Sequence, residues 1–191
     1  MNMIKDRGKI VFAVFVIMLA FVTSVQAAPK AGEITKTLEV IDFSVSDGMN
    51  TIQLDSSYEN FRIEKTEKIL DNNYVGNIFA GDFNYKYYIH EFEDFNLYTS
   101  NANYNLKDRN FDEYYITQIT LLNSSFKTQR GIAIGSNIDD IINAYGNKYS
   151  LDSDDKAVIF YSLNDMRLVF TIDENQKVQE LTMFIFVDDM E

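Results

Sequence analysis

The sequence predicts an α+β protein in which two tandem helix-strand-strand-strand units form one antiparallel sheet with the helices on one face. Three observations lead to this expectation: an internal repeat, a short helix marked at both ends, and apolar runs separated by polar turns. Antiparallel hairpins that follow a helix are typical of layered α+β domains.

The helix is marked most clearly in the second half of the chain. Ser136 is expected to be its N-cap, and Asp139 follows near the positive end of the helix dipole. Gly146 can adopt the left-handed conformation that ends a helix. Four apolar residues between these ends recur at helical spacing and would form one buried face: Ile138, Ile141, Ile142 and Tyr145.

Three strands are expected after this helix. Residues 158–163, 166–172 and 177–187 are rich in apolar residues, and polar stretches at 164–165 and 173–176 supply the turns between them. A helix followed by this meander forms the second unit, which we place at residues 126–191.

The first half of the chain shows the same order in a degenerate form. A helix is expected within residues 52–61, where apolar residues match those of the second unit: Ile52, Leu54, Tyr58 and Phe61 stand where Ile132, Ile134, Ile138 and Ile141 stand. The stretch 92–97 then parallels 163–168, and 116–121 parallels 178–183. We interpret this as a duplication whose first unit covers residues 48–125, with longer loops at 70–81 and 100–112.

The first 27 residues have the features of a cleavable export signal. A positive start precedes an uncharged apolar run from Ile10 to Val22, and small residues at Val25 and Ala27 fit a signal-peptidase site. As a helix this run spans only about 20 Å, against about 30 Å of membrane hydrocarbon. We therefore expect a secreted or periplasmic protein with no membrane anchor after cleavage.

Residues 28–47 form a leader segment between the signal and the first unit. Its apolar residues are expected either to form an extra strand or to pack under a helix: Leu38, Val40, Ile41 and Phe43. Removal of the signal takes away three basic residues and one acidic residue, which changes the formal net charge from −12 to −14. Such a charge repels nucleic acid and anionic membranes, so neither is expected as a partner.

A glycine-flanked Gly-Ile-x-Ile-Gly segment (Gly131–Gly135), a helix ending in Tyr145 and Gly146, and a meander over 158–187 form one continuous pattern. It resembles the tandem helix-plus-sheet units of the beta-lactamase-inhibitor-protein-like group and its relatives, the SmpA/OmlA outer-membrane assembly lipoproteins. The resemblance covers about residues 48–187. It implies a non-enzymatic protein that binds other proteins, in the inhibitors through the open sheet face. The chain has no cysteine for a lipid or for the inhibitors' disulfides, and no functional residue is carried over.

Residues that could carry catalysis are few. His90 is the only histidine and lies in a predicted strand, where a surface or cross-strand role is expected rather than a catalytic one. Acidic clusters are expected in turns and on the surface: Glu91, Glu93 and Asp94; Asp152, Asp154 and Asp155; Asp173 and Glu174; Asp188, Asp189 and Glu191. We predict no catalytic residue, cofactor or metal ligand, although paired carboxylates leave open a hydrolase acting on envelope glycans or peptides.

Aromatic residues on the strands indicate where a partner would bind. If alternate residues from Leu181 to Ile185 face the helices, Phe184 and Phe186 face away from them. By the same alternation three tyrosines are expected on this outer face: Tyr88, Tyr114 and Tyr161. Exposed aromatic residues often mark protein interfaces, so we predict a protein partner in the cell envelope or outside the cell. The alternatives are that the leader, a long loop or a second subunit covers this face, as in a self-assembling structural envelope protein.

Overall fold

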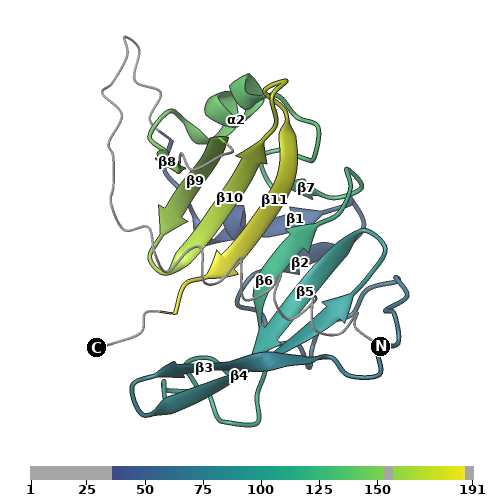
Figure 1. Ribbon diagram of the computed structural model, residues 1–191, viewed down its shortest axis with the longest axis vertical. Helices are drawn as coiled ribbons and strands as arrows, with labels where there is room; N and C mark the ends of the chain where they lie inside the picture. The colour runs from purple at the N-terminus through teal and green to yellow at the C-terminus, as the bar shows by residue number, and fades with distance from the viewer. Residues whose placement is uncertain (1–35, 153–156, 188–191) are drawn as a thin grey trace.

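The computed structural model describes residues 36–152 and 157–187, which form two antiparallel sheets (Figure 1). The large sheet has eight strands in the order β3-β4-β5-β6-β11-β10-β9-β8, and the small sheet has three in the order β2-β1-β7. The expected antiparallel, sheet-rich architecture is therefore confirmed. The predicted export signal lies outside the described residues. Within the described ranges no helix is both long and apolar enough to cross a membrane.

The elements have the following bounds. The large sheet contains β3 (Tyr74–Ala80), β4 (Phe83–Glu91), β5 (Phe95–Ser100), β6 (Tyr115–Leu121), β8 (Ser150–Asp152), β9 (Ala157–Leu163), β10 (Met166–Ile172) and β11 (Val178–Ile185). The small sheet contains β1 (Ser44–Ser46), β2 (Thr51–Gln53) and β7 (Lys127–Thr128). The helices of the described residues are the 3-10 helix η1 (Val40–Phe43) and the α-helix α2 (Ile138–Tyr145). The leader thus contributes both a helical turn and a strand.

Two meanders, β4-β5-β6 and β9-β10-β11, meet where β6 pairs with β11. The first hairpins of the two meanders have equivalent registers, since His90 pairs with Leu97 and Tyr161 pairs with Leu168. This agrees with the match between residues 92–97 and 163–168. The third strands are offset. Leu97 pairs with Ile119, and the equivalent Leu168 pairs with Met183. The sequence match of 116–121 with 178–183 aligns Ile119 with Leu181 instead, so the observed register differs from it by two residues.

The helix predicted within residues 52–61 is not formed, so the tandem helix-plus-sheet prediction was wrong for the first unit. Asp55 has a φ of 66°, which turns the chain out of a helical path. Backbone N–H groups that a helix would use internally donate instead to distant carbonyls: Leu54 to Phe43, Asp55 to Ile116, and Tyr58 to Tyr114. The alternation of Ile52 and Leu54 was that of a strand, and pairing with β1 and β6 outweighed the weak helical spacing.

The second predicted helix is present as α2. Its N-cap is Asn137, one residue later than predicted, and Asp140 accepts a hydrogen bond from the Asn137 backbone N–H at 3.0 Å. The hydroxyl of Ser136 accepts one from the Ala133 N–H just before the helix. Gly146 ends the helix with a φ of 89°, and its N–H donates to Ile142 O at 2.8 Å.

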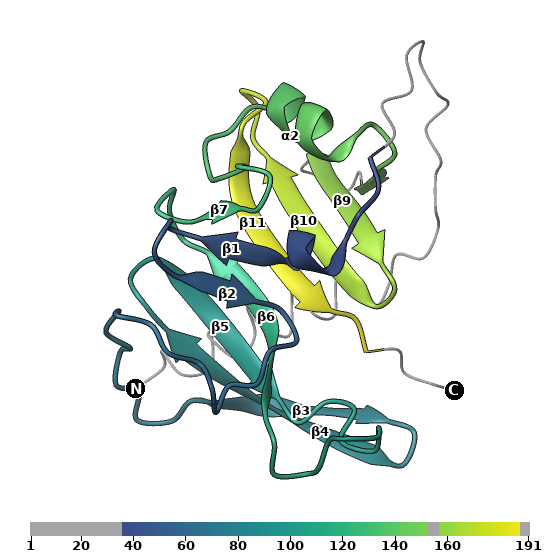
Figure 2. The same ribbon diagram turned by 180° about the vertical axis from the view of Figure 1, so that it is seen from behind.

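One hydrophobic core lies between the large sheet and the elements that cover it. The small sheet, η1 and α2 pack on the same side of the large sheet (Figure 2). Both meanders contribute to this core, with Phe95 and Leu97 from the first and Leu168 and Phe170 from the second, all fully buried. Since β1 contributes Val45, the leader is an integral part of the fold.

Arg130 joins the leader to the second half of the chain. Its Nε donates to Asp42 Oδ1 at 2.6 Å and its Nη2 to Asp42 Oδ2 at 2.5 Å. The remaining N–H groups bind the backbone carbonyls of Thr37 and Ala144, at 2.7 and 2.9 Å. The guanidinium also lies 5.0 Å from the centre of the Tyr145 ring. Asp42 is only 3% exposed, so this bidentate pair is largely shielded from water.

Buried tyrosines predict a loss of stability in alkaline solution. Burial raises the pKa of Tyr98 to about 12 and that of Tyr145 to about 12, whereas both ionise near pH 10 when unfolded. Below pH 10 the phenols are protonated in both states. Above it the unfolded state loses its protons first, so stability falls as pH rises from 10 to 12, by about 1 kcal/mol per tyrosine at pH 11. Urea unfolding at pH 8 and 11 measures this loss, and Tyr98→Phe should reduce it. Equal losses in both proteins would contradict the assignment.

Candidate functional site

The β3–β4 hairpin forms an extension of the large sheet with a small core of its own. It lies at the lower end of the molecule in Figure 1, beyond the part covered by the small sheet. Its turn is Gly81-Asp82, where Gly81 has a φ of 58°. One face of the hairpin packs on residues of the 101–112 loop and on Val187, in a cluster built around four buried residues: Ala80, Tyr85, Tyr87 and Ala102.

Three tyrosines lie side by side across the other face of this hairpin, and we call Tyr74, Tyr88 and Tyr114 the tyrosine row. The Tyr74 and Tyr88 rings are 5.5 Å apart at 61°, and those of Tyr88 and Tyr114 are 5.4 Å apart at 80°. Both contacts are edge-to-face, which is a favourable geometry for aromatic pairs. Tyr74 is 43% exposed, and the other two are half-buried. Burial and the neighbouring Tyr88 raise the pKa of Tyr114.

Further apolar side chains are exposed on the hairpin and on the loop that covers its other face. Phe79 on β3 is 67% exposed, and Leu106 and Phe111 on the 101–112 loop are also exposed. Lys86 holds its ammonium 4.7 Å from the Phe111 ring centre. Tyr74 donates a hydrogen bond to Asn77 Oδ1, which fixes the orientation of the exposed ring. This end of the molecule therefore presents aromatic surface on a strand pair.

The structure brings together two of the five predicted partner-binding residues. Tyr88 and Tyr114 are in contact, but they lie on the face of the sheet that also carries the core, beyond the end of the core. Tyr161 points into the core because it pairs with Leu168, and its hydroxyl donates to Gly146 O at 2.7 Å. Phe184 and Phe186 lie on the opposite face from Tyr161. Phe184 is buried, and half-buried Phe186 has the Arg167 guanidinium 5.6 Å from its ring centre.

His90 is buried in a polar cluster next to the tyrosine row. Its Nδ1 lies 2.8 Å from Glu67 Oε1 and 2.8 Å from the Tyr58 hydroxyl, and its Nε2 lies 3.1 Å from Thr99 Oγ1. The Tyr58 ring covers the imidazole at a centroid distance of 4.1 Å. The pKa of Tyr58 is raised, first by burial and then by the Glu67 carboxylate. The cross-strand contact with Thr99 agrees with the cross-strand role expected for this histidine.

The order carboxylate, histidine, hydroxyl is also the order of a catalytic triad. Here, however, Thr99 is only 2% exposed, so its hydroxyl cannot reach a substrate without rearrangement of the sheet. The cluster instead satisfies buried polar groups and holds the segment before β3 against β4. Sequence reasoning missed Glu67, since it lies 23 residues from His90 in a segment without regular structure.

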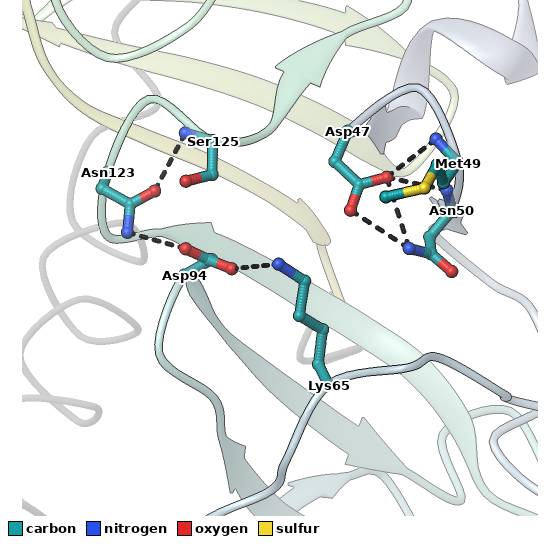
Figure 3. A network of polar contacts seen from close by, with 7 residues as sticks. All are labelled: Asp47, Met49, Asn50, Lys65, Asp94, Asn123 and Ser125. Atoms are coloured by element: carbon teal, nitrogen blue, oxygen red, sulfur yellow. Dashed lines mark hydrogen bonds and ion pairs between the residues drawn. The ribbon is translucent and has the colours of Figure 1, made fainter.

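Two aspartates in turns have structural partners, Asp94 of the first predicted acidic cluster, which is buried, and Asp47. Asp94 accepts hydrogen bonds from Lys65 Nζ at 2.7 Å and from Asn123 Nδ2 at 3.0 Å (Figure 3). These two bonds, that of Lys65 first, lower the pKa of the carboxyl. Asp47 accepts from the backbone N–H groups of Met49 and Asn50 in the β1–β2 turn, and the bond from Asn50 lowers its pKa (Figure 3). A general acid needs the opposite shift.

Known proteins give no further guide to this site. Comparison found no matching protein family, no matching curated protein and no matching solved structure. The resemblance to the beta-lactamase-inhibitor-protein-like group therefore stays a prediction. Among the residues that the structure describes, no three His, Cys, Asp or Glu side chains are grouped so that they could hold a metal ion.

Proposed function

We propose that this chain is a non-enzymatic, exported protein-binding module that contacts its partner through the tyrosine row and the exposed apolar residues beside it. The observation that carries the proposal is the row itself, in which Tyr88 contacts both Tyr74 and Tyr114 and Tyr74 is open to solvent. Tyrosine offers a large, rigid ring and a polar hydroxyl, and it is enriched among the residues that dominate binding energy.

The surroundings of the row support a protein partner that carries basic groups. Asp112 is exposed and lies close enough to Tyr114 to raise its pKa, and exposed Asp71 precedes Tyr74 by three residues. Carboxylates beside aromatic rings favour Lys or Arg side chains that pair with the carboxylates and stack on the rings. The net charge, −12 for the full chain and −14 without the predicted export signal, would accelerate the approach of such a partner.

A hydrolase is less well supported. The pKa values of Asp47 and Asp94 are shifted downward, away from the range of a general acid. The hydroxyl beside His90 belongs to a buried threonine. An aromatic surface on a strand pair favours a binding role over a hydrolytic one.

Site-specific photocrosslinking tests the binding proposal. A photoreactive phenylalanine analogue at Phe79 should capture a protein other than a second copy of this chain from envelope or culture fractions of the host, whereas the same group at fully exposed Ile69 should not. With the captured protein in hand, Tyr88→Ala and Tyr114→Ala should each weaken binding about tenfold or more. Ile69→Ser is the matched control and should leave binding unchanged. Equal capture at Phe79 and Ile69, or full affinity in both tyrosine variants, would refute the proposal.

A further inference from the structure

The outer edge of β3 is an unpaired sheet edge without charge. In the described part of the chain β3 is the first strand of the large sheet and pairs only with β4. No charged residue occurs from Asn72 to Gly81. Exposed edges of this kind readily pair with another strand, because their N–H and C=O groups point at solvent.

The opposite edge of the same sheet is protected in the usual way. It is formed by β8, a strand of three residues that ends at Asp152, and two more aspartates follow in the sequence at positions 154 and 155. Short strands and charged residues are the common means of preventing edge pairing. With seven residues and no charge, β3 has neither form of protection.

The hairpin geometry identifies the backbone groups that point outward. In a two-residue hairpin the residues flanking the turn, here Ala80 and Phe83, form a hydrogen-bonded pair, and such pairs alternate along the strands. The Lys86 N–H accordingly points away from β3 and donates to Asn101 Oδ1 at 2.8 Å. By the same alternation, Asn77 and Phe79 direct their N–H and C=O groups to the open edge.

We propose that this edge pairs antiparallel with β3 of a second copy of the chain, about a two-fold axis at Ile78. A bulge lies between Tyr74 and Gly76, so Gly76–Ala80 is the regular part of the strand and Ile78 is its centre. In this register Asn77 lies opposite Phe79 of the other copy. The two symmetric pairs make four backbone hydrogen bonds, since each bonded antiparallel pair exchanges two.

Side chains and charge favour this register. The two Phe79 rings lie diagonally across the axis on one face, within reach of each other for aromatic side chains. The paired stretch carries no charge, so two copies with a net charge of −12 can approach here without placing like charges opposite each other. The pairing uses the strand edge instead of the ring faces of the tyrosine row, and it therefore does not depend on the proposed function.

The interface is small, and a weak dimer is expected. Edge pairing of one strand lies at the low end of specific interface sizes, for which dissociation constants in the micromolar range, roughly 10–100 μM, are reasonable. Sedimentation equilibrium of the protein, in the form that the expressing host releases, should show a monomer–dimer equilibrium over this range of concentration.

Two edge variants and one control test the interface. Asn77→Pro removes an edge N–H without removing a hydrogen bond to β4, and Phe79→Lys places a charge on the edge. Each should weaken dimerisation at least about tenfold. Ile69→Lys introduces the same charge at a fully exposed apolar position and should leave the dimer unchanged. A monomer at all concentrations, or a dimer that tolerates both edge variants, would overturn the proposal.

Cysteine pairing tests the register, because the chain contains no cysteine of its own. In the proposed register Ile78 lies opposite Ile78 of the other copy as a non-hydrogen-bonded pair, with Cα atoms about 4.5 Å apart, close enough for a disulfide. Ile78→Cys should therefore give a covalent dimer under mild oxidation, and Phe79→Cys should give little. The reverse pattern, or no covalent dimer from Ile78→Cys, would rule out the two-fold axis at Ile78.

Discussion

Replacing Arg130 with alanine is expected to lower the free energy of unfolding by about 3 kcal/mol or more. The arginine neutralises Asp42, a carboxylate that is almost entirely buried. Without it the Asp42 carboxyl has no ionic partner in a site shielded from water, and the carbonyls of Thr37 and Ala144 lose their donors. The loss therefore exceeds that of a surface ion pair, which contributes at most about 1 kcal/mol.

Urea unfolding followed by circular dichroism measures this effect. Arg62→Ala is the matched control, because exposed Arg62 donates only to backbone carbonyls of nearby residues, and a change below about 0.5 kcal/mol is expected. The double variant Asp42→Leu/Arg130→Met should be more stable than Arg130→Ala, since it leaves no unpaired buried charge. If Arg130→Ala were as stable as the control, the pair would not hold the leader in place.

Replacing Phe95 with alanine is expected to cost about 3–5 kcal/mol, the range for large aromatic residues in a core. Phe95 is fully buried, and its ring centre lies 4.6 Å from that of Phe92 and 5.1 Å from that of Phe126. The surrounding strands are held by their ladders, so they cannot close the cavity. Phe170→Ala, in the second meander, should cost a similar amount because it belongs to the same core.

Thermal unfolding by calorimetry tests whether the two meanders share one core or have two separate cores. Both variants should unfold in a single transition at lower temperature, since the two meanders share their apolar side chains. Phe79→Ala is the control, and its exposed ring should leave the transition within about 0.5 kcal/mol of the parent protein. Two separate transitions in Phe95→Ala would show that each meander folds independently.

Elements with strong local signals were predictable from the sequence. The second helix has an N-cap, an apolar face and a terminal glycine within a few residues, and its position was correct to one residue at the N-cap. The turns at residues 93–94 and 164–165 were equally clear, since short polar pairs between apolar runs favour two-residue hairpins. In these places the residues of the element itself were enough to predict it.

Elements that depend on distant partners were not predictable. Residues 74–80 contain Gly76 and Asn77 and were expected to form a loop, yet they form β3 because β4 supplies a ladder for them. The helix expected within residues 52–61 is absent for the same reason, because backbone groups of this segment bond to β6 and to the residue before β1. The side-chain direction of Tyr114 was missed because alternation cannot be carried across the irregular register of β5 and β6.

The ion pair between Arg130 and Asp42 also has a consequence for the folding rate. Asp42 and Arg130 are 88 positions apart, and Val45 of β1 pairs with Thr128 of β7. Contacts between such distant positions require large loops to close before they contribute stability, which slows the search for the native topology. The segment around η1 and β1 therefore has no stable place to dock until the residues around Arg130 have been synthesised.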